Sequence, residues 1–149
     1  MAHITPPRQL LIAAGTCGSR LSASTVAAAI ARGIQASGLP EPDLCPLSPA
    51  DEATADVRAL LDSIDFDARM RRARAVVIAA PLLEERTLAG SLAFEIATRA
   101  RQSGVPAYAV TAENRLDAFD ARILDLQLIL EARGPRSLET AGRKLAGVV

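Results

Sequence analysis

A short run of small and polar residues near the N-terminus is the segment of this sequence best suited to chemistry. Residues 15–22, GTCGSRLS, follow an apolar run and precede an amphipathic helix pattern. A turn of this type at a helix N-terminus presents backbone amides and small hydroxyls, which bind an anion without any charged side chain. We therefore predict an anion-binding site made by Thr16, Cys17, Gly18, Ser19, Arg20 and Ser22.

Two of these side chains have alternative interpretations. Arg20 could contact a phosphate, but a solvated arginine explains it more simply. Cys17 lies where a helix dipole could lower the pKa of its thiol, whereas Cys45 lies in an apolar segment typical of a buried free thiol. Two cysteines are too few for a disulfide framework and lack metal-ligand spacing, so we predict neither a disulfide nor a metal site.

Two further loops should meet this turn, because parallel strands of one sheet end at the same edge. They follow the second and third predicted strands, at residues 48–54 and 81–87. Their polar residues give four additional candidates at this edge: Glu52, Thr54, Glu84 and Thr87. No catalytic residue is predicted, because His3 is the only histidine and the acids at 51, 52, 117, 120 and 125 suit helix ends or solvated faces.

Strand and helix patterns alternate along the chain. The predicted strands are residues 10–14, 44–47, 73–80, 105–110 and 126–130. The predicted helices run from Ser22 or Ser24 to Gly38, from Ser48 through Leu61, and over residues 87–103, 116–125 and 137–148. This order predicts a single three-layer α/β domain over residues 8–149, with about five mainly parallel strands, Rossmann-like or flavodoxin-like. Residues 1–7, with two prolines, are predicted to be a flexible tail.

The composition limits which binding partners and which cellular location we expect. Lysine plus arginine and aspartate plus glutamate number 17 each, so no net charge favours nucleic acid or an anionic membrane. No apolar run approaches the roughly 20 residues that span a bilayer, which predicts a cytoplasmic protein.

In the predicted helix 87–103, Leu88, Leu92 and Phe94 spread wider than one core face requires, which predicts a homodimer.

Three short segments, at residues 12–23, 46–54 and 87–90, match motifs of one enzyme family, and through them the sequence resembles the type I glycerate kinases. Their first strand enters a turn of the form Ile-Ala-Pro-Asp-Ser-Phe-Lys-Gly-Ser-Leu-Ser-Ala, and this chain has Ile12-Ala13 followed by residues 19–23, SRLSA. The family's Pro-x-Ala-Asp-Gly-Gly-Glu-Gly-Thr loop aligns with residues 46–54 of this chain. Residues 87–90 match the Thr-Leu-x-Gly motif of a later helix in the family. The resemblance covers residues 8–146, with the family's inserted second domain absent after Asp62.

The charged groups of the family's loops are missing. The resemblance places them at Gly15, Gly18, Pro49, Leu82 and Ser91. It therefore implies a non-catalytic glycerate-kinase-like domain that binds a small anion or a protein partner. The alternative is an active, ATP-dependent small kinase or transferase that completes its site in an oligomer, and only then would ATP and magnesium be its cofactors.

Overall fold

Five parallel strands form the centre of the molecule in the computed structural model, which describes residues 8–15, 21–47, 56–85 and 90–149. They are β1 (Leu11–Ala14), β2 (Asp43–Pro46), β3 (Val76–Leu83), β4 (Ala107–Asn114) and β5 (Leu126–Glu131). They pair in the order β2-β1-β3-β4-β5, and each neighbouring pair is parallel. This is the flavodoxin-like strand order, so the predicted fold class is confirmed.

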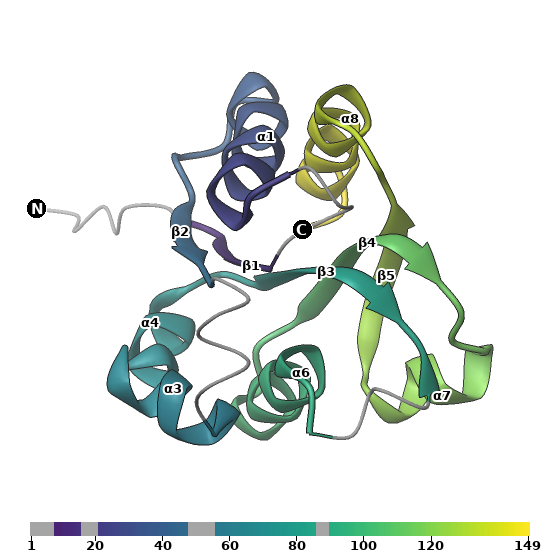
Figure 1. Cartoon of the computed structure of the whole chain (residues 1–149). Helices are drawn as coiled ribbons and strands as arrows, with labels where there is room; N and C mark the ends of the chain where they lie inside the picture. Colours follow the sequence, from purple (N-terminus) through teal and green to yellow (C-terminus); the bar gives the residue numbers. More distant parts are fainter. Residues whose placement is uncertain (1–7, 16–20, 48–55, 86–89) are drawn as a thin grey trace, which may run out of the picture.

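Helices cover both faces of the sheet (Figure 1). One face carries α1 (Ala23–Ala36) and α8 (Pro135–Ala146). The other carries α3 (Val57–Ser63), α4 (Phe66–Arg72), α6 (Leu92–Ser103) and the short α7 (Ala118–Ile123). The result is the predicted three-layer arrangement, in which each side of the sheet has its own hydrophobic cluster.

Strand β1, which lies between β2 and β3, is buried on both faces. Leu10, Ile12 and Ala14 belong to the cluster under α1 and α8, whereas Leu11 and Ala13 belong to the cluster on the opposite face. A parallel strand covered on both sides needs apolar residues at every position, because successive side chains alternate between its faces. The unbroken apolar run in the sequence therefore has the physical cause that we predicted.

A helix-helix contact without intervening side chains joins α1 to α8. A Cβ added at Gly33 of α1 would meet Glu139 O of α8, and one added at Gly142 of α8 would meet Ile30 O of α1. Glycine inside a helix costs roughly 1 kcal/mol relative to alanine, so both residues need a compensating role. That role is the close approach of the two backbones, which the sequence patterns did not predict.

Arg99 of α6 links the helices on the other face. Its guanidinium contacts Asp62 of α3 at 3.0 Å, Asp67 of α4 at 3.1 Å and Glu95 of its own helix at 3.3 Å. These bonds raise the pKa of Arg99 although partial burial acts to lower it, so its charge persists at any ordinary pH. One arginine thus fixes the relative positions of three helices.

Both predicted ends of α1 are confirmed. Ser22 Oγ accepts a hydrogen bond from Thr25 N at 3.2 Å, which makes Ser22 the N-cap. After the helix, Gly38 has a φ of +91°, a left-handed conformation that favours glycine. The chain is therefore forced to turn here towards β2.

The predicted end of β3 is wrong. The strand continues past residue 80 to Leu83, so the following loop begins at Glu84 rather than at Pro81. Pro81 is tolerated because the described pairing of β1 with β3 ends at Ala79, so no described residue of β1 lies opposite Pro81 to accept the N–H bond that proline lacks.

Several other boundaries also differ from prediction. α4 was not predicted; Asp65, with a φ of +55°, separates it from α3. α6 begins at Leu92 rather than at residue 87, after the cap Ser91, and α8 begins at Pro135 rather than at Ser137. β4 covers Ala107–Asn114 instead of the predicted residues 105–110, and α7 covers Ala118–Ile123 instead of 116–125. β2 covers Asp43–Pro46 instead of 44–47. The predicted helix start at Ser48 lies outside the described residues, and the described helix there begins at Val57 with Asp56 as its N-cap.

Two of the three residues that prompted the homodimer prediction pack within the chain. Leu92 and Phe94 are partly buried against the cluster beneath α6, and Leu88 lies outside the described residues. Their wide spacing on the helix is therefore explained by the neighbouring segments of the same chain. The homodimer stays a prediction.

We predict that Gly33→Ala and Gly142→Ala each lower the free energy of unfolding by at least about 2 kcal/mol, because the new methyl group would overlap backbone atoms of the facing helix. Urea denaturation measures the change. Gly147→Ala is the matched control, since a Cβ there meets its nearest atom at 3.5 Å and should fit. Unchanged stability of both helix variants would contradict the close packing of α1 on α8.

Candidate functional site

A cavity of about 210 Å³ opens at the carboxyl edge of the sheet, where β1 and β3 end. Its wall is made by Gly15 at the end of β1, by residues 78–82 of β3, by Glu84, and by Ser91, Leu92 and Ala93 at the start of α6. Helix α1, which follows β1, packs on one face of the sheet, and α6, which follows β3, packs on the other (Figure 1). The cavity thus lies at a topological switch point, the usual ligand position in open α/β sheets.

The N-terminus of α6 forms one side of this cavity. Ser91 is the N-cap, with its Oγ accepting a hydrogen bond from Phe94 N at 3.2 Å. The positive end of the helix dipole is located here, which favours negative charge in the cavity. Gly90 precedes the cap with a φ of +78°, so the turn that places Ser91 favours glycine.

Glu84 is the one charged side chain among the described residues that line the cavity, and it is paired. Arg115 Nη1 donates to Glu84 Oε2 at 3.1 Å, and Arg115 Nε donates to Glu113 Oε1 at 2.9 Å. The bonds to Glu113 and Glu84 raise the pKa of Arg115. Arg115 N also donates to Leu83 O at 2.8 Å, which fixes the arginine at the end of β3. One arginine thus pairs with two carboxylates, so the cluster of Glu84, Arg115 and Glu113 keeps one net negative charge beside the cavity.

The structure describes two of the predicted site residues. Glu84 lines the cavity, and the Ser22 hydroxyl caps α1 while lying 2.9 Å from Thr25 Oγ1. Whether either residue binds a ligand stays a prediction. The remaining candidates lie outside the described residues: Thr16, Cys17, Gly18, Ser19, Arg20, Glu52, Thr54 and Thr87. Sequence reasoning missed Ser91 as part of the site, although a serine after glycine at the start of a helical pattern is an N-cap signal.

Three positions singled out by the glycerate kinase resemblance meet at this cavity. Gly15, Leu82 and Ser91 come from three separate segments, and all three line it. The other two such positions, Gly18 and Pro49, lie outside the described residues. The described lining therefore holds glycine, leucine and serine where the resemblance places charged groups.

Other chemical features lie away from this cavity. Cys45 is a buried free cysteine in β2, and burial raises the pKa of its thiol. No group of three histidine, cysteine, aspartate or glutamate residues could hold a metal ion within the described segments. None of the described helices is long and apolar enough to cross a membrane.

Comparison with known proteins supports the fold and nothing more specific. No protein-family model and no curated protein matches the sequence. A Burkholderia pseudomallei structure, described as a pilus assembly-related protein, is similar with a TM-score of 0.51 and 17% identity over 94% of this chain and 90% of that one. A flavodiiron protein from Giardia intestinalis has a TM-score of 0.45 and 13% identity over 93% of this chain and 34% of that one. The class that the structure defines is a flavodoxin-like α/β protein.

We predict that Ser91→Ala lowers the free energy of unfolding by about 1 kcal/mol, because the amide of Phe94 loses its acceptor. Ser91→Asp should retain the stability, since aspartate caps a helix as well as serine does. Ser103→Ala, at the exposed other end of α6, is the control and should have little effect. Urea denaturation distinguishes the three variants, and equal stability of all three would contradict the capping role.

Proposed function

We propose that this chain is a non-catalytic, glycerate-kinase-like domain that binds a small anion in the cavity at the carboxyl edge of its sheet. The observation that carries the proposal is the convergence of Gly15, Leu82 and Ser91 on one cavity. These residues are far apart in sequence, and only the resemblance links them as positions of family loops. Finding them around one cavity is what a common binding site requires.

The residue types at this cavity favour binding over phosphoryl transfer. Phosphoryl transfer needs cationic or metal-bound groups on the phosphates and a group that positions the acceptor. Here the described lining offers one charged side chain, the acidic Glu84, and Arg115 is shared between Glu84 and Glu113. The lining otherwise consists of glycine, alanine, proline, serine and aliphatic residues, which can enclose a ligand but cannot stabilise the transferred charge.

The size and polarity of the cavity indicate the kind of ligand. Its volume of 210 Å³ equals that of about seven liquid water molecules and lies below the roughly 300 Å³ at which drug-sized pockets begin. A small carboxylate or phosphate fits this space better than a nucleotide does. The N-terminus of α6 supplies the favourable potential, and the apolar wall of β3 contacts the uncharged part of the ligand.

A protein partner is the second candidate, because α7 exposes two large apolar side chains. Phe119 is 69% exposed and Ile123 is 48% exposed, on a helix of only six residues. Exposed apolar groups that lie close together on a surface are typical of interaction sites. This interpretation predicts no small ligand, so a binding experiment separates it from the first.

We predict that the protein binds D-glycerate, and that Ala80→Met abolishes this binding by filling the carboxyl-edge cavity. Ala80 lines the cavity and is only partly buried, so the longer side chain can be accommodated without unfolding. Thermal shift and calorimetry measure the effect; ligand at a hundredfold excess over its Kd stabilises the fold by about 2.7 kcal/mol.

Ala36→Met, at the exposed end of α1, is the matched control and should bind like the native protein. Ser91→Asp retains the cap but places a carboxylate at the cavity, so it should weaken anion binding. Normal binding by Ala80→Met would show that the ligand sits elsewhere. If D-glycerate does not bind, the protein-partner interpretation takes precedence.

We also predict no ATP- and magnesium-dependent conversion of glycerate to phosphoglycerate, because the charged groups that transfer requires are absent from the described lining. A coupled assay for ADP with mass spectrometry of the product tests this. Product formation that Arg20→Ala abolishes would support the alternative, a kinase that completes its site in an oligomer. A trace rate unaffected by Arg20→Ala would point to a contaminating enzyme and leave the prediction intact.

A further inference from the structure

A second cavity lies at the amino edge of the sheet, opposite the first. It has a volume of about 250 Å³ and is lined by Gln9, Asp43, Arg69, Arg72 and Ala73. Gln9 precedes β1, Asp43 begins β2, and both arginines belong to the last turns of α4. We propose that this cavity binds a phosphoryl group, either as inorganic phosphate or at the end of a small phosphomonoester.

The first arginine is held in place before any ligand arrives. Arg69 Nε and Nη2 donate to the two carboxylate oxygens of Asp43 at 3.0 and 2.7 Å, and Nη2 also donates to Leu44 O at 3.0 Å. The bond to Asp43 raises the pKa of Arg69, so it is charged at any ordinary pH. The neighbouring Cys45 also acts to raise the pKa of Arg69, so β2 holds this guanidinium through more than one residue.

The second arginine provides the excess charge. Arg72 Nε donates to Ala68 O at 3.2 Å, which anchors the side chain, while its two Nη atoms have no partner among the described residues. Gln9 Nε2 donates to Glu41 O at 2.7 Å and leaves the second amide hydrogen available. The cavity therefore combines two planar guanidinium groups and an amide, a donor set that matches phosphate oxygens.

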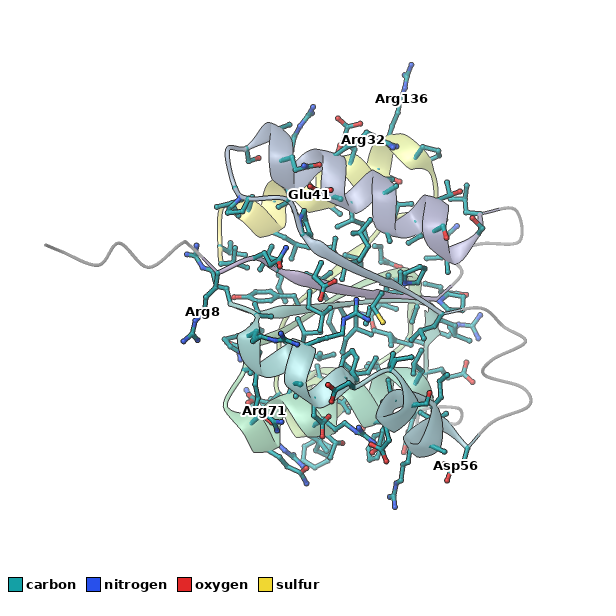
Figure 2. All side chains as sticks on the ribbon, turned by 90° about the vertical axis from the view of Figure 1, so that its left-hand side faces the viewer. Arg8, Arg32, Glu41, Asp56, Arg71 and Arg136 are labelled. Atoms are coloured by element: carbon teal, nitrogen blue, oxygen red, sulfur yellow. The ribbon has the colours of Figure 1, made fainter. Side chains whose placement is uncertain are left out.

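Charge favours phosphate over a carboxylate. Asp43 offsets Arg69, which leaves Arg72 uncompensated in the lining. Three more arginines are chain neighbours of the lining residues, Arg8 beside Gln9, Arg71 beside Arg72 and Arg74 beside Ala73, of which Arg74 already donates to Val149 O at 2.7 Å. Figure 2 shows Arg8 and Arg71 at the same end of the molecule. A phosphomonoester carries about −1.5 to −2 charges at pH 7, more than a carboxylate, and suits this excess.

Stabilisation of the α4 C-terminus does not by itself explain how the side chains are arranged around the amino-edge cavity. Basic residues in the last turn of α4 stabilise the negative end of that helix, which accounts for the charge of Arg69, Arg71 and Arg72. It does not account for Arg69 reaching across to Asp43 of β2, or for Arg72 and Gln9 lining one cavity with it. The inference is also independent of the proposed function, because the two cavities lie at opposite edges of the sheet.

Titration of the isotopically labelled full chain with inorganic phosphate, at constant high ionic strength, tests the proposal by amide NMR. We expect shifts at Gln9, Leu44 and Ala73, and a loss of affinity of about tenfold in Arg72→Gln, because charge-assisted hydrogen bonds disappear. Arg72→Lys keeps the positive charge but lacks the planar guanidinium, so its affinity for phosphate should lie between those of the native protein and of Arg72→Gln. Arg69 is left unchanged, since removing it would leave Asp43 without its partner.

Arg32→Gln is the matched control: it removes the same charge from an exposed position on α1 and should bind phosphate normally. Equal weakening in Arg32→Gln would reveal general charge attraction and overturn the proposal, as would the absence of localised shifts. Acetate and glycerol 3-phosphate are the comparison probes, and acetate binding as tightly as phosphate would refute the phosphoryl assignment. Shifts confined to Gly15, Ala79 and Ser91 would report the carboxyl-edge cavity instead and would also refute it.

Discussion

The backbone pairing of β1 between β2 and β3 is the constraint on which the rest of the structure depends. Gly15 N donates to Ala79 O at 2.8 Å, and Leu47 N donates to Ala14 O at 2.8 Å, so the three strands are tied together where β1 ends. From this point the chain continues to a helix on one face, while β3 continues to a helix on the other. The cavity at the carboxyl edge is therefore a consequence of strand order, and Gly15 belongs to both the pairing and the cavity wall.

The parts of the fold that the sequence predicts well are those set by local rules. A strand covered on both faces requires the continuous apolar run of β1, and caps such as Ser22 and Gly38 mark helix ends by their own hydrogen bonds and φ values. The missed features depend on distant segments. Pro81 opposes strand formation in any local pattern, yet β3 includes it because β1 has already ended, and Gly33 reveals its role only when α8 packs against it.

In the candidate sites too, local sequence predicts some features, whereas others depend on segments far apart in the chain. Glu84 could be placed at the sheet edge from its position after a strand, but its pairing with Arg115 depends on the alignment of β3 with β4. Likewise, Arg69 and Asp43 are 26 residues apart, and nothing local indicates that they share a cavity. The equal numbers of acidic and basic residues were also uninformative, because a total of zero says nothing about where the arginines gather.

The side chains now at the carboxyl-edge cavity contribute to stability in a way that charged groups would not. Ser91 satisfies an amide in the first turn of α6, and Leu82, partly buried at the end of β3, adds apolar area to the wall. Active sites commonly reduce the stability of a fold, because their charged groups must be held together and partly desolvated. On the proposed kinship with glycerate kinases, exchanging those groups for a cap and an aliphatic side chain removes that cost. Under that proposal, the same residues that replace the charged groups also favour a stable binding domain.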